Sequence, residues 1–302
     1  MRTTIRYGKS QVSLYRTYAR PLTGVTPIPE SAFRGRGNVL LAADVDVEVL
    51  GSNFLRAYTH GDNSNVVATD TMKNFIQRTA LEFDGCTLEQ LLAYLGERFL
   101  ATWPAMERVR LTAHESAFEA AATPAGPSPV LFSRSRDDHG YGLLEMTRAS
   151  GAILDHRFGR VGLQLIKVTG SSFANFVRDD YTTLPEVTDR PLFIYLDVFW
   201  RYRDVGDAIG PDTSRYVAGE QVRDLAQVVF HEFVSLSIQH LVHEIGRRLL
   251  ARFPQLAEVG FEAQNRLWDT AAVSETDERV KVYTDPRPPY GSIGLVLARD
   301  PA

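Results

Sequence analysis

Strict alternation of apolar and polar residues marks two long strands in the first half of this chain, over residues 3–19 and 41–51. This period of two is typical of antiparallel strands that bury one face and expose the other. Strand-like segments also open the second half, at residues 140–151, 161–171 and 190–204. We therefore expect antiparallel sheets in both halves.

Apolar residues recur at helical spacing in four other segments, two in each half. In the stretch NVVATDTMKNFI, the polar pair Thr69–Asp70 stands just before such a pattern. Thr and Asp side chains accept hydrogen bonds from the free N–H groups of a first helical turn, so we expect Thr69 or Asp70 to cap this helix. The expected helices span residues 69–83, 87–102, 218–229 and 231–252.

Two segments of the chain resemble each other. LGERFLATWPAMERVRLTAHE (95–115) and IGRRLLARFPQLAEVGFEAQN (245–265) align without gaps. Each reads as the end of a helix, an aromatic–proline pair that stops it, and an alternating strand. The repeat indicates that the two halves of the chain share one plan.

Each half reads strand, strand, helix, helix, strand, with a final strand still to be found. Residues 292–299 supply it in the second half, and residues 128–134 are the candidate in the first. The prediction is an α+β chain of two tandem modules, residues 1–137 and 138–302, each an antiparallel sheet layered with a helix pair. Exposed sheet edges of this kind favour oligomers.

Composition limits the possible partners and compartment. The 302 residues are 44% hydrophobic and carry a formal net charge of -4, so nucleic acid is not expected as a partner. Cys86 is the single cysteine, which rules out an internal disulfide and suits a reducing compartment. We see neither a signal peptide nor a run of roughly 20 apolar residues that could span a membrane, and expect a cytoplasmic protein.

Three histidines lie close together in HEFVSLSIQHLVHE, namely His231, His240 and His243. A zinc protease helix carries His-Glu-x-x-His, and neither HEFVS nor HLVHE has that spacing. No third ligand for His240 and His243 is evident. We expect histidines that lie on a helix surface or pack against neighbours, and no metal site.

The segment GSSFANFVRDDYTTLPEVTDRP (170–191) leaves two interpretations open. It can be a surface loop, or Phe173 and Arg190 can orient a flat anion, since a ring stacks on it and a planar guanidinium meets adjacent acceptors. Gln239 is equally open: it is either a helix-surface residue or a reader of a paired N–H and C=O edge.

Four segments together resemble the urate oxidase (uricase) family, in the same order and at compatible spacing. They are RYGKSQV, NSNVVATDTMKN, SFANFVRDDYTTLPEVTDR and PPYGSIGLVLAR, and the resemblance runs from about residue 5 to residue 299. It implies two tunnelling-fold modules per chain and a homotetramer around a tunnel, with active sites at subunit interfaces. It also implies oxidation of urate by dioxygen to 5-hydroxyisourate and hydrogen peroxide, without a cofactor.

The resemblance assigns roles to residues around the proton and the dioxygen. Lys9 and Thr69 match the family's proton-transfer dyad, and Thr69 also faces the dioxygen site. Asp70 matches the residue whose backbone N–H binds the purine. Asn265, in EAQNRLWDT, matches the asparagine that holds dioxygen or water above the ring.

Three further matches concern the ring of urate. Phe173 matches the stacking phenylalanine, and Arg190 matches the arginine that grips the pyrimidine edge. Gln239 matches the glutamine whose amide pairs with the ring, and Ile238 falls where the family uses a backbone N–H.

One position departs from the family pattern. Leu267 stands where better-known members carry a histidine, two residues after the asparagine. Leucine cannot relay a proton, so a weakly active or non-catalytic purine-binding protein is an alternative. A second rival is a tunnelling-fold enzyme acting on a pterin or a related purine. Such enzymes usually carry a glutamate at the ring edge and often zinc, whereas Gln239 suits urate.

Overall fold

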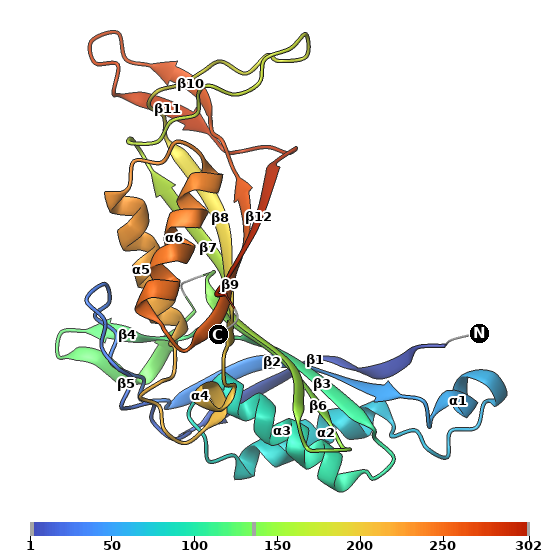
Figure 1. Cartoon of the computed structure of the whole chain (residues 1–302). Helices are drawn as coiled ribbons and strands as arrows, with labels where there is room; N and C mark the ends of the chain where they lie inside the picture. The colour runs from blue at the N-terminus through green and yellow to red at the C-terminus, as the bar shows by residue number, and fades with distance from the viewer. Residues whose placement is uncertain (1–2, 135–136, 301–302) are drawn as a thin grey trace. The chain divides into compact units, whose positions relative to one another are not determined.

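The computed structural model describes residues 3–134 and 137–300 (Figure 1). The chain forms two compact units, each made of several segments. Unit 1 contains residues 1–27, 33–159 and 201–219, and unit 2 contains residues 28–32, 160–200 and 220–302. Within the described residues, no helix is both long and apolar enough to cross a membrane.

The sheet of unit 1 contains four antiparallel strands. Their order is β1 (Ile5–Thr17), β2 (Leu40–Gly51), β3 (Arg108–Glu115) and β6 (His139–Thr147). The alternation of the sequence becomes an alternation of burial, since Val45, Val47 and Val49 of β2 are buried and the residues between them are partly exposed.

Helices cover one face of this sheet (Figure 1). α2 (Thr69–Thr79) runs into a short 3₁₀ helix, η1 (Ala80–Glu82), and α3 (Leu88–Thr102) ends before Trp103–Pro104. Two short helices, α1 (Leu55–His60) and α4 (Gly206–Ile209), were not predicted. The core between sheet and helices includes Val45, Val47, Met72, Ile76, Leu91, Leu95, Val109 and Leu111.

Unit 2 repeats this plan. Its strand order is β7 (Ile153–Lys167), β8 (Leu192–Tyr202), β9 (Leu256–Asn265) and β12 (Gly291–Ala298), and the first residues of β7 and the last of β8 belong to unit 1. α5 (Gly219–Glu232) and α6 (Ile238–Arg252) lie together against these strands (Figure 1). Buried side chains include Ile194, Leu196, Leu225, Leu241, Ile245, Val259 and Phe261.

A hairpin and an arginine at a helix end appear at equivalent places in both units. A two-stranded hairpin follows the third strand of each, β4 (Glu119–Thr123) with β5 (Gly126–Ser133) and β10 (Asp269–Val273) with β11 (Lys281–Thr284). An arginine after the last strand of each unit donates to carbonyls at the end of a helix: Arg148 to Leu100 and Trp103 at α3, and Arg299 to Leu250 and Phe253 at α6. The internal repeat is therefore a structural duplication, and the predicted α+β class is confirmed.

Two strand predictions in the middle of the chain were wrong. Residues 126–133 form β5 of a separate hairpin, and the fourth strand of unit 1 is β6, which we had assigned to the second half. The reason is burial: β5 has no continuous buried face, whereas β6 buries Leu144 and Met146. The division into tandem modules at residues 137 and 138 stays a prediction.

The fourth predicted helix also began too early. Residues 231 and 232 end α5, and α6 begins at Ile238. Ser235 interrupts the helical pattern because its carbonyl accepts a hydrogen bond from the Ser172 N–H, at 2.8 Å. The Ser237 side chain then caps α6 by accepting from the His240 N–H, at 3.1 Å.

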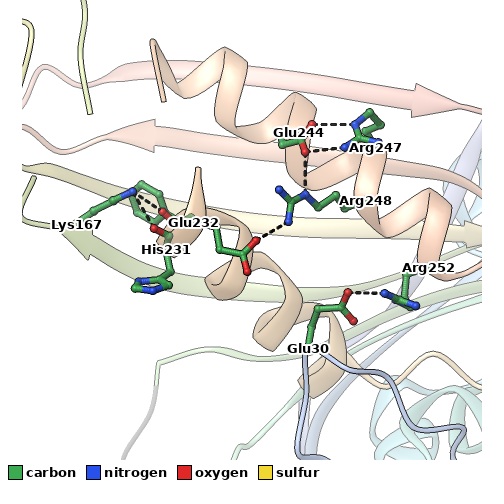
Figure 2. A network of polar contacts seen from close by, with 9 residues as sticks. Glu30, Lys167, His231, Glu232, Glu244, Arg247, Arg248 and Arg252 are labelled. Carbon is green, nitrogen blue, oxygen red and sulfur yellow. Dashed lines mark hydrogen bonds and ion pairs between the residues drawn. The ribbon is translucent and has the colours of Figure 1, made fainter. Parts of the chain in front are cut away.

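Ion pairs join the two helices of unit 2 (Figure 2). Glu244 of α6 accepts hydrogen bonds from Arg247 and Arg248, and these bonds hold the pKa of its carboxyl down at about 2. Arg248 reaches on to Glu232 of α5, at 2.9 Å. Arg252 pairs at 2.6 Å with Glu30, from the short segment that unit 2 takes from the first half of the chain.

Lys167, the last residue of β7, binds the C-terminal end of α5, where Glu232 also lies (Figure 2). Its Nζ donates to the carbonyls of Phe230, His231 and Phe233 at 2.9, 3.2 and 3.1 Å. A cation at this end also complements the helix dipole. Lys167 therefore holds in place the end of α5 from which the segment leading to α6 begins.

Candidate functional site

Lys9 lies on β1 immediately before an irregularity in its pairing with β2. Lys9 pairs with Val47, and the register then shifts before Val12, where the Gln11 backbone has a positive φ of 56°. Cross-strand partners share a face of the sheet, so Lys9 points to the same side as buried Val47, the side of the helices. A bulge of this kind redirects neighbouring side chains.

Gly8 explains why a glycine precedes this lysine. A Cβ at position 8 would stand 1.8 Å from the carbonyl oxygen of Val47. Only glycine permits β1 and β2 to approach this closely, so the Gly-Lys pair has a local structural cause.

The start of α2 differs from the prediction. Ala68 is the N-cap residue, and no side chain caps the helix. Thr69 is the first helical residue and Asp70 the second, so the expected cap from either residue is wrong. The consequence favours a binding role, because the first N–H groups of a helix have no intrahelical acceptor and the dipole attracts an anion.

Two contacts fix this helix start. The Val67 N–H donates to the Tyr7 hydroxyl at 3.0 Å, which ties the incoming loop to β1. The Asp70 carboxylate is engaged by Lys73 at 2.5 Å and by Asn74 at 3.2 Å. The Lys73 hydrogen bond is the main cause of a lowered pKa at Asp70, and Lys9 adds a smaller electrostatic contribution, so Lys9 lies near the start of α2.

In unit 2, the loop between β7 and β8 is pinned at both ends by Asp189. Its carboxylate accepts from the Thr169 hydroxyl and from the Gly170 N–H, both at 2.6 Å, and these bonds lower its pKa. The Arg190 N–H donates to the Ser171 carbonyl at 2.9 Å, and Phe173 exchanges two backbone hydrogen bonds with Val187. The loop is therefore an ordered clasp that presents Phe173 and Arg190 together.

The Arg190 side chain is the least satisfied polar group of this clasp. Its guanidinium carbon lies 5.6 Å from the centre of the Phe173 ring. Among the described residues, Nε of Arg190 is buried with no hydrogen-bond partner, and no carboxylate pairs with the guanidinium. Burial lowers the pKa of Arg190. A half-buried cation of this kind favours an anionic ligand.

Phe173 is held from one side. Its ring stacks on Phe176 at 5.0 Å with an angle of 14° between the planes. Phe176 was not predicted as a site residue, although its spacing of three from Phe173 within the loop was a usable signal.

α6 presents its first residues next to the same loop. Ser235, just before the helix, bridges to Ser171, and its hydroxyl donates to the Ser171 hydroxyl at 3.1 Å. Ile238 is buried at the first helical position, and Gln239 is exposed at the second. The Gln239 amide has no hydrogen-bond partner within the described part of the chain.

Asn265 is the last residue of β9 and pairs with Gly291, the first residue of β12. Val259, Phe261 and Ala263 are buried on the helix side of β9, and the alternation places Asn265 on that side too. Among the described residues, its Oδ1 is buried without a hydrogen-bond partner. Leu267, two residues later, is 36% exposed.

The predicted site residues thus fall into two groups. Unit 1 holds Lys9, Thr69 and Asp70 around the start of α2, and unit 2 holds Phe173, Arg190, Ile238, Gln239 and Asn265. The supporting residues Tyr7, Asp189 and Ser235 escaped the sequence analysis because their role depends on hydrogen bonds between distant segments.

The histidines lie apart from both groups. His231 belongs to α5, His240 and His243 belong to α6, and all three are exposed, which confirms the surface assignment. Within residues 3–134 and 137–300, no three His, Cys, Asp or Glu residues gather in a way that could hold a metal ion.

Comparison with known proteins gives a consistent result. The family model described as Uricase matches residues 43–145 and 156–294, a range that includes every predicted site residue except Lys9. The uricase of Haloferax volcanii is 48% identical over 95% of this chain and 96% of its own length. The uric acid degradation bifunctional protein PucL of Bacillus subtilis is 47% identical over the whole chain.

This chain spans only about three-fifths of the bifunctional relatives, 62% of the Bacillus subtilis protein and 58% of its Bacillus sp. TB-90 counterpart. Solved structures agree with the fold described above. A crystal structure of urate oxidase from Bacillus sp. TB-90 superimposes with a TM-score of 0.95 at 46% identity, over 98% of this chain and 100% of that one.

Proposed function

The chain belongs to the uricase family, and from that premise we propose that it oxidises urate with dioxygen to 5-hydroxyisourate and hydrogen peroxide. The observation that carries the proposal is the Arg190 guanidinium, half-buried beside Phe173 without a carboxylate among the described residues. Urate is a flat anion near neutral pH, and it supplies both the ring face and the charge that this pair lacks.

Binding draws on both groups of residues. Phe173 stacks on the ring, Arg190 meets two adjacent acceptors, and the Gln239 amide pairs with an N–H and C=O edge. The backbone N–H groups of Asp70 and Ile238 stand at two helix starts, where the dipole favours an anion. These contacts orient urate before any chemistry.

Lys9 and Thr69 then remove a proton and make an electron-rich dianion. Such proton transfer is typically worth about 10²–10⁴-fold in rate. The dianion reduces dioxygen held near Asn265 and Thr69, and a peroxide forms on the ring. Hydrogen peroxide leaves and water adds, so urate, dioxygen and water yield 5-hydroxyisourate and hydrogen peroxide. Urate supplies both electrons, and the mechanism uses no cofactor.

We propose a homotetramer in which the unit 1 group of one chain meets the unit 2 group of another. β1 and β12 lie at the ends of the strand order, and their free edges can pair with another chain. Mixing impaired Thr69→Val chains with impaired Arg190→Ala chains should then raise activity to roughly a quarter of the wild-type value, because that fraction of sites draws intact residues from both chains. No recovery after confirmed subunit exchange would place each site within one chain.

Turnover is tested directly by following urate through its near-ultraviolet absorbance, together with oxygen uptake and peroxide, in the presence of EDTA. We expect oxygen uptake that matches urate loss and does not respond to EDTA. Tight urate binding without oxygen uptake would favour a purine-binding protein, the alternative that Leu267 suggests. Turnover abolished by EDTA would favour a metal-dependent enzyme.

The cytoplasmic location stays a prediction. It rests on the single cysteine, Cys86, which is free and buried in unit 1. Absence of the protein from a cytosolic fraction of its native cells would contradict it.

A further inference from the structure

Arg266 directly follows Asn265 and has an unusual environment. Its guanidinium carbon lies 4.1 Å from the ring centre of Tyr195 on β8 and 3.7 Å from that of Tyr290, the residue before β12. Nε and an Nη also donate to the Gln264 side-chain oxygen, at 3.0 and 2.6 Å. No carboxylate pairs with Arg266 in the described part of the chain, so two aromatic faces and one amide hold this cation.

The position of this cluster matters because the strand ladder ends there. Asn265 and Gly291 form the last pair between β9 and β12. Gln264 and Arg266 point to the face of the sheet opposite Asn265, because side chains alternate along a strand. The cluster of Tyr195, Arg266 and Tyr290, here called the arginine clamp, therefore ties three strands together behind Asn265.

The duplicated unit provides an internal control. In the gap-free alignment of the two halves, Ser116 corresponds to Arg266 and Glu115 to Asn265. The Ser116 N–H donates to Ala42 on β2 at 2.8 Å, just as the Arg266 N–H donates to Phe193 on β8 at 2.9 Å. The backbone thus closes in the same way with serine, so the fold does not require the clamp.

The clamp is also absent where no ligand is expected. Glu115 pairs with Arg36 at 2.5 Å, whereas the Asn265 Oδ1 is buried without a partner among the described residues. The unpaired Asn265 amide needs a rigid backbone to bind a ligand productively. Misplacing a group in an active site by about 1 Å can lower the rate about a hundredfold.

We propose that Arg266 is a positioning residue that acts through Asn265, with Tyr195 and Tyr290 holding its guanidinium in place. This inference rests on the proposed urate oxidation and on the role given there to Asn265. It adds that unit 2, which supplies Asn265, holds this amide over the ring by means of a cation–π clamp.

The test is a double-mutant cycle between Arg266→Gln and Asn265→Ala. Each single substitution should lower kcat about tenfold or more and raise the KM for dioxygen, while the anaerobic dissociation constant for urate stays within about twofold. Arg266→Gln should cost nothing further in the Asn265→Ala protein, because the residue it positions is gone. Losses that multiply would overturn the proposal, as would an unchanged kcat in folded Arg266→Gln.

Substitutions at Tyr195 keep the proposal testable should Arg266→Gln fail to fold. Tyr195→Phe retains the aromatic face and should retain kcat, whereas Tyr195→Leu should lower it with the same loss of effect in the Asn265→Ala background. Equal activity of the two Tyr195 variants would reject the clamp. A wild-type protein that binds urate but takes up no oxygen would reject the proposed function, and the positioning role with it.

Discussion

The starts of α3 and α6 are the two regions of the molecule that invite comparison, because the duplication makes them equivalents. Each helix has a hydroxyl N-cap, Thr87 or Ser237, that accepts from the N–H three residues later, at 3.2 and 3.1 Å. Extending the alignment back from the repeat places Glu89 of α3 opposite Gln239 of α6. The two helices begin with the same kind of cap, but Glu89 and Gln239 lie in different environments.

Glu89 is buried inside unit 1, with 5% of its surface exposed. The Tyr216 hydroxyl lies 3.2 and 3.1 Å from its two carboxylate oxygens, and the Tyr216 ring packs with Leu22 and Val25. Burial raises the pKa of Glu89 to about 7. The chain therefore fills the space at this helix start with its own tyrosine.

Gln239 is exposed, and it belongs to unit 2, as do Arg190 and Asn265. The Gln239 amide, Nε of Arg190 and Oδ1 of Asn265 have no hydrogen-bond partner in the described part of the chain. In unit 1, by contrast, the equivalent of Asn265 is Glu115, which pairs with Arg36. At these two aligned positions, unit 1 pairs its carboxylates with its own Tyr216 and Arg36, whereas unit 2 leaves the Gln239 and Asn265 amides open to a ligand.

Exchanging the two residues breaks this comparison most severely. Gln239→Glu places a carboxylate against an anionic ligand and removes an amide donor, so kcat/KM for urate should fall about a hundredfold or more. Steady-state kinetics measures this. Glu89→Gln, the reverse change in unit 1, is the matched control and should leave kcat/KM unchanged. Equal losses in both variants would remove the distinction between the units.

The proton-transfer pair provides the next largest effect. Thr69→Val keeps the shape of the side chain but removes its hydroxyl, and should lower turnover by about tenfold or more with little change in urate binding. Lys9→Met should do the same. The double variant should be little worse than either single one, since the two residues act as a unit. Strictly multiplicative losses in kcat would argue against a dyad.

Arg190→Lys, in the loop between β7 and β8, should have a smaller effect on turnover. Lysine retains the positive charge but lacks the planar fork that meets two acceptors, so the apparent KM for urate should rise more than kcat falls, by about tenfold. Initial rates over a range of urate concentrations separate the two parameters. An unchanged affinity would exclude Arg190 from the site.

Leu267→His should alter the pH dependence of turnover, because histidine titrates near its unperturbed pKa of about 6.5. If a proton relay is missing here, kcat should rise, mostly on the acidic side of the profile. If a water held by Asn265 or Thr69 already fills that role, kcat should fall. A melting curve must accompany the kinetics. An unchanged kcat and profile in a folded variant would place position 267 away from the reaction.

The smallest effect on activity, and a clear one on stability, concerns Glu89. Its pKa is about 7 in the folded chain against 4.5 ordinarily, so the folded state holds an extra proton between these values. Protonated Glu89 contributes its full stabilisation below pH 4.5. As the pH rises through 7 this contribution is lost, which lowers the free energy of unfolding by about 3 kcal/mol. Glu89→Gln should remove that dependence, seen in urea unfolding from pH 5 to 8. An identical slope in both proteins would contradict it.

Local patterns predicted the elements of the fold well, because burial alternates along β2 and β8 as the sequence does. They failed where distant segments decide. Ser235 leaves the helix for a hydrogen bond to Ser172, and β6 rather than β5 joins the first sheet because of its buried face.

The site divides in a similar way. Family resemblance pointed to Phe173, Arg190, Gln239 and Asn265, and the structure adds that Nε of Arg190 and Oδ1 of Asn265 are buried without a hydrogen-bond partner among the described residues. The resemblance could not reveal that Ala68 occupies the N-cap position of α2 with no side-chain cap, or that Tyr216 fills the matching space in unit 1. Both depend on backbone geometry and packing that no local sequence pattern encodes.

The central claim is that only one of the two duplicated helix starts receives urate, and the number of urate molecules bound per chain tests it most directly. Calorimetric titration of the intact protein without oxygen should give one urate per chain. Gln239→Glu should abolish that binding, and Glu89→Gln should leave it unchanged. Two urate molecules per chain, or one that persists in Gln239→Glu and disappears in Glu89→Gln, would contradict the account.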